Sequence, residues 1–236
     1  MWSGPRNIST ALMRSWEARG DTAIWDEPLY GYYLRRSGIE HPGKAEIIAA
    51  GENDWRVVTA RCAGPVPNGK RIFYQKHMTQ HVLPELDREW LLALRNCFLI
   101  RDPREVIASY ARTRPEVTAD DVGMARQAEL FEWLAARAAS PPPIIDSADV
   151  LRDPSGMLAR LCDALDVEYS VKMLHWTPGP HDGDGVWGKY WYASVWRSTG
   201  FTPYVARETR LSERLERIAA ECDAPYQALY ARRLRV

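Results

Sequence analysis

A guanidinium and a hydroxyl lie around one predicted strand-to-helix junction in the middle of the chain. The apolar run Phe98-Leu99-Ile100 is typical of a buried strand, and Arg101 follows it directly. Pro103 favours the first turn of a helix, where its missing N–H leaves no backbone bond unmade. Arg101 and Ser109, two turns into that helix, could bind one small anion, to which the helix N-terminus adds partial positive charge. The junction therefore predicts a phosphate site.

A second anion-binding pattern opens the chain, at Gly4-Pro5-Arg6-Asn7-Ile8-Ser9-Thr10. A Gly-Pro turn, a cation and two hydroxyls ahead of a helical run are the composition of a phosphate-cradling loop, whose backbone N–H groups converge on oxyanions. The pattern is not a Walker A motif, because Ser9 stands where the second Gly belongs and Thr10 where the Lys belongs. The candidate phosphate-binding residues of this loop are Arg6, Asn7, Ile8, Ser9 and Thr10.

Together these patterns resemble the nucleotide-binding motifs of sulfotransferases that use 3′-phosphoadenylyl sulfate (PAPS). Residues 6–10 are similar to the 5′-phosphosulfate loop of that family, [KR]-x-G-[ST]-T. Residues 101–109 are similar to its 3′-phosphate motif, R-[DN]-P-x-[DE]-x-x-x-S, in both the Arg-to-Ser spacing and the Pro. Tyr74-Gln75-Lys76-His77-Met78 looks like the Lys/His segment beside the transferred group. Residues 183–189 resemble the loop that closes over the nucleotide, which implies that Lys189 binds it.

Two features depart from the family pattern. Ile8 occupies the place of the family's Gly, and a branched residue does not readily take positive φ, so Asn7 is the residue expected to adopt it. Met1-Trp2-Ser3 is short for the expected first strand. Either that strand is very short or the natural chain starts upstream.

Catalysis requires a group that accepts the proton of the incoming hydroxyl, because an alcohol is a poor nucleophile until a base begins to remove that proton. Glu27 follows a predicted strand, and partial burial would raise its pKa toward the working range. His77 follows the next strand and titrates near neutrality. The resemblance slightly favours Glu27, and a structural role stays open for each. Lys76 would neutralise the leaving phosphate, and Arg6 would stabilise the sulfuryl group during transfer.

Strands and helices alternate along the chain, which predicts an α/β fold: a three-layer sandwich with a mostly parallel central sheet flanked by helices, P-loop-like. One domain is expected over 1–236, with an irregular aromatic-rich lid or docking segment at about 173–203, where periodicity fails. The predicted strands are Thr22 to Trp25, Arg71 to Gln75, Cys97 to Ile100 and Ile144-Ile145. The predicted helices are Leu83 to Leu94, Val106 to Arg112, Ala119 to Ala139, Pro154 to Leu165 and Leu211 to Ala231.

Composition agrees with a cytoplasmic enzyme. Lys plus Arg equals Asp plus Glu at 31 each, so no overall field attracts nucleic acid or an anionic membrane. The four cysteines are scattered without a C-x-x-C pair, which favours free thiols in a reducing compartment. No basic-then-apolar leader and no 18-residue apolar run occurs, so membrane insertion is not expected.

Together these features predict a PAPS-dependent sulfotransferase. It is expected to act on a small-molecule, carbohydrate or lipid acceptor, to release PAP and to need no metal. Its aromatic residues between 176 and 196 suit acceptor walls or core packing equally. One alternative is a P-loop small-molecule kinase, against which the missing Walker Lys counts. Another is a non-catalytic nucleotide-binding protein. Structural alternatives also stay open: Ser9 and Thr10 as helix caps, and Arg101 as an ion-pair partner of Asp102 or Glu105.

Overall fold

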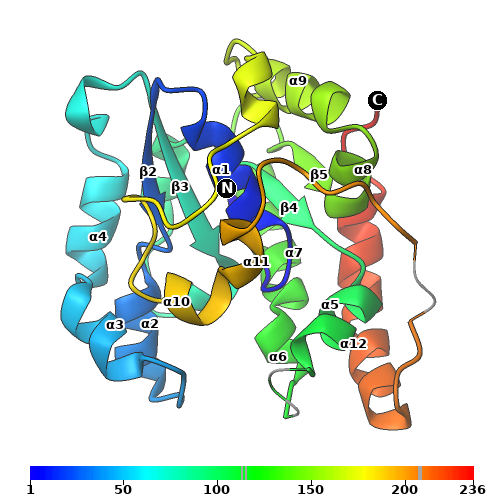
Figure 1. The fold of residues 1–236 in the computed structure, drawn as a ribbon. Helices are drawn as coiled ribbons and strands as arrows, with labels where there is room; N and C mark the ends of the chain where they lie inside the picture. Colours follow the sequence, from blue (N-terminus) through cyan, green and yellow to red (C-terminus); the bar gives the residue numbers. More distant parts are fainter. Residues whose placement is uncertain (113, 115, 207–208) are drawn as a thin grey trace. The chain divides into compact units, whose positions relative to one another are not determined.

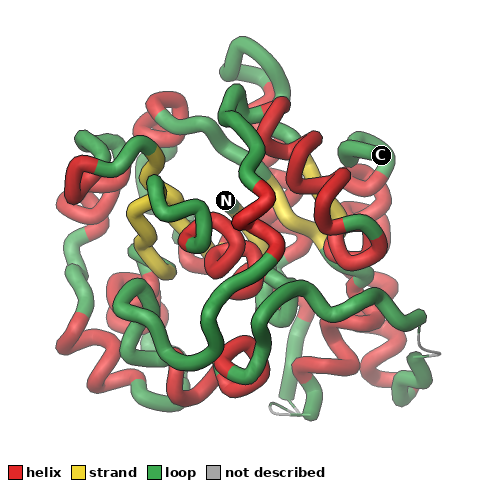
Figure 2. The backbone as a smooth tube through the Cα atoms, turned by 45° about the horizontal axis from the view of Figure 1, so that its top comes forward, coloured by secondary structure: helices red, strands yellow, loops and turns green. Residues whose placement is uncertain are grey.

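The computed structural model describes residues 1–112, 114, 116–206 and 209–236. Within that part the chain divides into two compact units (Figure 1). Unit 1 consists of Met1, Thr10–Leu94 and Ser170–Phe201, and unit 2 of Trp2–Ser9, Arg95–Tyr169 and Thr202–Val236. Helices and loops account for most of each unit, and the strands are short (Figure 2).

Unit 1 contains one parallel strand pair, formed by β2 (Thr22–Asp26) and β3 (Ile72–Met78). The register aligns Thr22 with Ile72 and Asp26 with Lys76, so the last residue of β2 lies beside the lysine near the end of β3. Helix α1 (Ser9–Glu17) presents an apolar side to this pair, and the Trp16 ring stacks on Tyr74 with ring centroids 5.3 Å apart. The strands predicted at Thr22 to Trp25 and Arg71 to Gln75 are confirmed.

The remaining helical segments of unit 1 are short. They are α2 (Tyr30–Ser37), α3 (Lys44–Ala50), α4 (Trp55–Cys62), α10 (Gly188–Trp191) and α11 (Ala193–Trp196), with 3-10 turns at Pro67–Gly69, Thr79–His81, Glu89–Ala93 and Val171–Leu174. The apolar periodicity of the sequence did not predict α2, α3 or α4. Short helices give too few turns for a clear apolar stripe, and tertiary packing stabilises them instead.

Unit 2 contains three parallel strands in the order β1 (Trp2–Ser3), β4 (Phe98–Ile100) and β5 (Ile144–Asp146). Phe98 packs edge-on against Phe131 in the core, with ring centroids 5.5 Å apart. The helices of this unit are α5 (Pro103–Tyr110), α6 (Ala119–Val122), α7 (Met124–Ala135), α8 (Ser147–Arg152), α9 (Pro154–Ala164) and α12 (Glu213–Tyr230). The described strands of both units pair in parallel and helices flank them, which confirms the predicted α/β class.

Two predicted helices were wrong in part. Between Leu83 and Leu94 the helical segment is a 3-10 turn at Glu89–Ala93, and ahead of it the chain makes a turn in which Leu86 N–H donates to the Leu83 carbonyl. The predicted helix from Ala119 to Ala139 is divided by Gly123, whose φ of 72° ends α6 and begins α7. Glycine adopts this left-handed conformation at little cost, so it ends one helix and permits a change of direction.

The segment expected at 173–203 is largely irregular and contains only the short helices α10 and α11 in regular α-helical form. Within the described residues, every helix is either too short or too polar to cross a bilayer. The expectation of a single domain over 1–236 stays a prediction.

Candidate functional site

The strand-to-helix junction predicted around Arg101 is present in unit 2. Strand β4 ends at Ile100, and α5 begins at Pro103. Asp102 is the N-cap of α5, and its side chain accepts a hydrogen bond of 2.8 Å from the Arg104 N–H. The acidic residue of the motif therefore caps the helix, which leaves Arg101 as the residue that enters the junction from the strand.

The loop at the start of the chain contacts this junction inside unit 2. Arg6 Nε donates to Ser109 Oγ at 3.0 Å, and Arg101 Nη1 donates to the Arg6 carbonyl oxygen at 2.7 Å. Asn7 Nδ2 donates to the Leu99 carbonyl at 3.2 Å, which ties the loop to β4. Two segments about a hundred residues apart thus bring Arg6, Arg101 and Ser109 together; we call these three residues the arginine cluster.

The backbone of the loop differs from the prediction at one residue. Positive φ falls on Arg6, at 57°, and not on Asn7. The Arg101 bond to the Arg6 carbonyl fixes this peptide, and the Asn7 side chain is engaged with β4. Gly4 is required nearby, since a Cβ there would lie 2.5 Å from the Val122 carbonyl oxygen. The loop turn therefore depends on Gly4 and on strain at Arg6, not on the residue in the family's Gly position.

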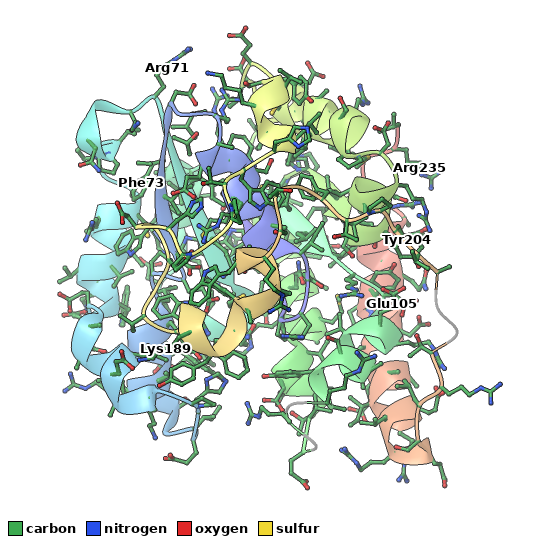
Figure 3. All side chains as sticks on the ribbon, viewed as in Figure 1. Arg71, Phe73, Glu105, Lys189, Tyr204 and Arg235 are labelled. Atoms are coloured by element: carbon green, nitrogen blue, oxygen red, sulfur yellow. The ribbon has the colours of Figure 1, made fainter. Side chains whose placement is uncertain are left out.

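The arginine cluster carries excess positive charge. Burial lowers the pKa of Arg6 because it disfavours the charged form, and the Arg101 guanidinium lowers it further because like charges repel. Glu105 offsets part of that charge: its Oε2 accepts from Arg101 Nε at 2.9 Å and from Nη2 at 2.8 Å. Tyr204, labelled beside Glu105 in Figure 3, donates to the other carboxylate oxygen at 2.8 Å. The Arg101–Glu105 ion pair considered from the sequence exists together with the cluster.

The other residues of the loop lie at the start of α1. Ser9 is buried and is the first residue of the helix, and Ile8 and Thr10 on either side of it are half-buried. Their positions fit backbone N–H groups directed out of a helix N-terminus. Phosphate binding by Ile8, Ser9 and Thr10 stays a prediction.

A second cluster of charged groups lies in unit 1 around Lys76. Its ammonium donates to Asp26 Oδ1 at 2.8 Å, to Glu27 Oε1 at 2.7 Å and to the Tyr192 hydroxyl at 2.7 Å. The β2–β3 register places Asp26 opposite Lys76, and Glu27 N–H donates to the Lys76 carbonyl at 2.8 Å. We call Lys76, Asp26, Glu27 and Tyr192 the lysine cluster.

The lysine cluster is buried, and burial controls its protonation. The side chains of Lys76 and Asp26 are 2% and 1% exposed, whereas that of Glu27 is 11% exposed. Burial raises the pKa of Glu27; Lys76 lowers it in part, and Asp26 raises it further. Burial alone would lower the pKa of Lys76, but Asp26, Glu27 and Tyr192 outweigh that effect and raise it well above its usual range. The cluster therefore pairs a charged lysine with a carboxyl suited to proton transfer.

The segment around 183–192 contacts the lysine cluster within unit 1. Gly185 N–H donates to Asp26 Oδ2 at 3.2 Å, and Trp187 Nε1 donates to the Tyr192 hydroxyl at 3.0 Å. Lys189, labelled in Figure 3, pairs with the Glu46 carboxylate at 2.7 Å and is half exposed. This ion pair occupies the ammonium that the resemblance assigned to the nucleotide, and the assignment stays a prediction.

His77 lies on the opposite face of β3 from Lys76, because neighbouring strand residues alternate. Its Nε2 is 3.2 Å from Gln75 Oε1, and its ring is 5.7 Å from that of Trp90. Burial holds the pKa of His77 well below its usual range, so the ring is neutral. The structure therefore groups Glu27 with Lys76 and does not include His77 in that cluster.

Two members of the lysine cluster were not predicted as site residues. Asp26 directly precedes Glu27 at the end of a predicted strand, and this adjacency could have identified it. Tyr192 was noted only as a possible acceptor wall, and its 116-residue separation from Lys76 leaves no sequence signal. His81, next along from β3, is stacked between Tyr30 and Tyr33 and is kept neutral by burial.

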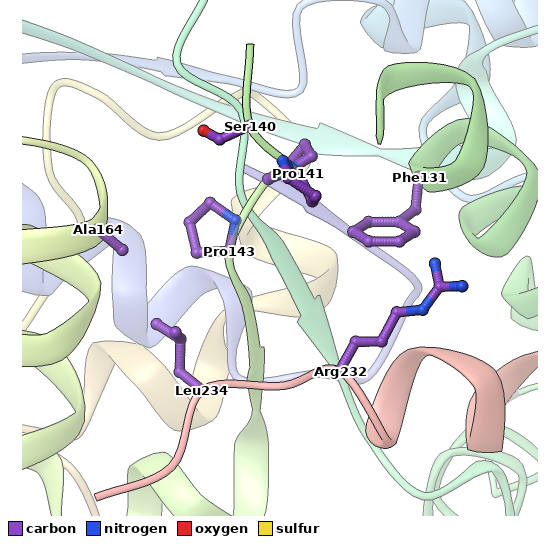
Figure 4. Close-up of a pocket in the computed structure, with 8 residues that line it drawn as sticks. Phe131, Ser140, Pro141, Pro143, Ala164, Arg232 and Leu234 are labelled. Carbon is purple, nitrogen blue, oxygen red and sulfur yellow. The ribbon is translucent and has the colours of Figure 1, made fainter. Parts of the chain in front are cut away.

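A pocket of about 460 Å³ in unit 2 lies apart from the arginine cluster (Figure 4). Pro143 lies just before β5 and Leu234 N–H donates to the Ile144 carbonyl, so the pocket is at the N-terminal end of that strand. Arg101 follows the C-terminal end of β4, and the two strands run parallel. The pocket is lined by Phe131, Ser140, Pro141, Pro142, Pro143, Ala164, Arg232 and Leu234. No group of three or more His, Cys, Asp or Glu side chains suited to a metal occurs in the described part of the chain.

Comparison with known proteins gives one family. A family model described as a sulfotransferase domain matches residues 1–231. The chain is 34% identical over 202 residues to Branched-chain-amino-acid aminotransferase-like protein 2 of Arabidopsis thaliana, and 35% identical over 202 residues to protein 1 of that name from the same plant. Each alignment covers 85% of this chain but 35% and 36% of the relatives, so the chain spans about a third of their length.

Two sulfotransferase domains are among the solved structures that resemble the chain. The sulfotransferase domain of the Synechococcus PCC 7002 olefin synthase has 18% sequence identity and a TM-score of 0.49, covering 93% of this chain and 92% of that domain. The sulfotransferase domain from the curacin biosynthetic pathway has 16% identity and a TM-score of 0.43, covering 93% and 95%.

Proposed function

We propose that this chain, which belongs to the family of sulfotransferase domains, transfers a sulfuryl group from PAPS to a hydroxyl or amine and releases PAP. The family supports sulfuryl transfer in general, and the donor and the acceptor are our proposal. The acceptor is a small molecule, a carbohydrate or a lipid. The proposed function involves no nucleic-acid partner and no insertion into a membrane.

The observation that carries this proposal is the arginine cluster. Arg101 uses Nε, one Nη1 proton and one Nη2 proton within the protein, so two of its five N–H groups stay available to a ligand. Two guanidiniums with one carboxylate partner suit a dianionic phosphate, because forked donors match phosphate oxygens. The donor set therefore fits PAPS, with Arg101 and Ser109 at the 3′-phosphate and Arg6 and the loop after it at the phosphosulfate.

In the proposed reaction, the acceptor oxygen or nitrogen forms a bond to sulfur, and the bond between sulfur and the bridging phosphate oxygen breaks. The acceptor proton passes to the Glu27 carboxylate. Lys76 and Arg6 stabilise the negative charge that develops on the leaving phosphate and the sulfuryl group. The products are the sulfated acceptor and PAP. Contact with Lys76 supports Glu27 over His77 as the base.

Thermal unfolding with added PAP, PAPS or ATP plus magnesium tests the donor. We expect PAP and PAPS to raise the unfolding temperature and ATP with magnesium to leave it unchanged, because a ligand that binds only the folded state stabilises it. Arg101→Ala removes charge-assisted hydrogen bonds worth about 1.5–3 kcal/mol each and should abolish the PAP response.

Arg104→Ala is the matched control, since Arg104 follows three residues later and pairs with Glu216 instead. It should retain the PAP response. A temperature rise with ATP and magnesium but not with PAP would overturn the proposal in favour of a small-molecule kinase. A PAP response without any sulfuryl transfer or PAPS turnover would favour the non-catalytic nucleotide-binding protein.

We further propose a cytoplasmic location. Cys62, Cys97 and Cys222 are buried free thiols, which is typical of a reducing compartment. Burial raises the pKa of the Cys62 thiol to about 12, so this cysteine is a poor nucleophile.

A further inference from the structure

The Lys76 ammonium has three N–H groups, and each has a protein acceptor. Asp26, Glu27 and Tyr192 accept one apiece at 2.7 to 2.8 Å. A lysine side chain is long and flexible, so an ammonium held from three directions has lost most of its freedom. Burial of this group excludes water that would otherwise compete for the same protons.

Tyr192 is bonded to Asp26 as well as to Lys76, so two of the three acceptors are linked to each other. Its hydroxyl donates to Asp26 Oδ2 at 2.6 Å while accepting from Lys76 and from Trp187 Nε1. Asp26 in turn receives Lys76 on one carboxylate oxygen, and Tyr192 and Gly185 N–H on the other. Asp26 and Tyr192 therefore form a closed triangle with Lys76, and Glu27 is bonded to one corner of it.

We propose that Tyr192 and Asp26 are positioning residues for sulfuryl transfer: they hold the Lys76 ammonium in place beside Glu27. The inference rests on the proposed function. Neither residue has to touch a substrate for this role, since each acts through Lys76 or Glu27. Glu27 is the most exposed carboxylate of the cluster, so it is the one that an acceptor proton reaches.

The network also accounts for what happens to the transferred proton. When Glu27 takes the acceptor's proton it loses its negative charge, and its attraction for the ammonium weakens. Asp26 and Tyr192 keep Lys76 in place at that moment, and one N–H of the ammonium becomes available to the departing phosphate oxygen. Proton acceptance and stabilisation of the leaving group are coupled through one lysine.

Two variants test the role, because they move the pKa of Glu27 in opposite directions. The Tyr192 hydroxyl lowers that pKa and the charge of Asp26 raises it. Tyr192→Phe should therefore move the acid limb of the kcat profile to higher pH, and Asp26→Asn should move it to lower pH. Lys76 within the cluster and the neutral His81 beside it are unchanged in both variants.

The measurement is PAP release from PAPS between pH 5 and pH 9, with 2-naphthol, glucosamine or water as the acceptor. We expect Tyr192→Phe to lower kcat about 10-fold, the effect of one lost hydrogen bond to a charged group. The KM for PAPS should stay within about 2-fold of that of the unchanged protein, because positioning of Lys76 acts in the transition state.

Tyr226→Phe is the matched control. Tyr226 is also a buried tyrosine that donates to an aspartate at the end of a strand, Asp146 Oδ2 at 3.1 Å, but that pair lies in unit 2 outside the lysine cluster. Tyr226→Phe should lower the free energy of unfolding about as much as Tyr192→Phe does, and should keep the pH profile of kcat. The inference is overturned if Tyr192→Phe keeps both kcat and the acid limb, or if Tyr226→Phe shifts the limb equally. Failure of the unchanged protein to turn over PAPS would instead overturn the proposed function.

Discussion

The lysine cluster and the arginine cluster both gather charge, but they balance it differently. In unit 1 one buried cation has two carboxylates and a hydroxyl, and every ammonium proton is bonded. In unit 2 two cations lie together and one carboxylate, Glu105, pairs with Arg101, which retains free donors. The first arrangement is complete without a ligand, whereas the second has donors that we propose bind an anion. The charge proposed to act in catalysis and the charge proposed to bind the nucleotide therefore differ in how fully the protein already pairs them.

Backbone strain is common to the two clusters. Arg6 and Glu27 are both non-glycine residues at positive φ, with values of 57° and 39°. Such conformations cost on the order of 1–3 kcal/mol each and persist only where the surroundings enforce them. The Arg101 bond holds the Arg6 carbonyl, and Glu27 is held by the Lys76 carbonyl and by Tyr30 N–H. In each cluster, the side chain of the strained residue bonds to another member: Arg6 to Ser109 and Glu27 to Lys76.

The largest effect should follow removal of the central cation of unit 1. Lys76→Met leaves Asp26 and Glu27 buried with like charges and no cation between them. Breaking a buried pair in this way costs about 3–5 kcal/mol of unfolding free energy, and loss of the charge should lower kcat by about 10²–10³-fold. Urea unfolding and PAP release from PAPS measure the two effects.

Glu27→Gln in the same chain as Lys76→Met gives the control. Removing the second charge should restore part of the lost stability, because one buried carboxylate is easier to accommodate than two. Unfolding free energies that simply add would contradict a coupled network in unit 1. Lys76→Met should still respond to PAP in thermal unfolding, because the arginine cluster is intact.

Glu27→Gln alone should change stability less than Lys76→Met does, so its main effect is expected on turnover. Removal of a general base typically lowers kcat by about 10²–10⁴-fold, and the Gln side chain retains the hydrogen bond from Lys76. His77→Gln should leave kcat near its starting value, since His77 lies on the opposite face of β3 and outside the cluster. Steady-state kinetics of both variants at pH 7 make the comparison. Equal and mild losses from the two would mean that neither residue is the base.

Much of the fold was predictable because its strands are buried apolar runs with clear ends. Phe98-Leu99-Ile100 and the Pro103 that opens α5 were predicted with the correct order and type. The division at Gly123 was not, since a single glycine also occurs inside helices and only its φ of 72° distinguishes the two cases. Helices α2 to α4 were missed because they are stabilised by packing and not by a long apolar period.

The arginine cluster was predictable for a different reason. Arg101 and Ser109 belong to one spaced motif, and a motif within ten residues carries its own geometry. The lysine cluster joins Asp26, Lys76 and Tyr192 across long stretches of chain, and only the β2–β3 register and the docking of residues 183–192 bring them together. Sequence reasoning found Glu27 and Lys76 separately but could not find the network that connects them.

The smallest effect should come from the hydroxyl in the arginine cluster. Ser109→Ala removes the acceptor of Arg6 Nε and one hydroxyl proposed to bind the 3′-phosphate. A hydrogen bond to a charged group contributes about 1.5 kcal/mol or somewhat more, so the Kd for PAP should rise about 10-fold in isothermal titration, with kcat almost unchanged. Ser140→Ala, at the pocket of Figure 4, should leave PAP binding unaltered. If Ser109→Ala instead abolished PAP binding as Arg101→Ala should, the cluster would form one coupled network like that of Lys76, and the contrast between the two clusters would fail.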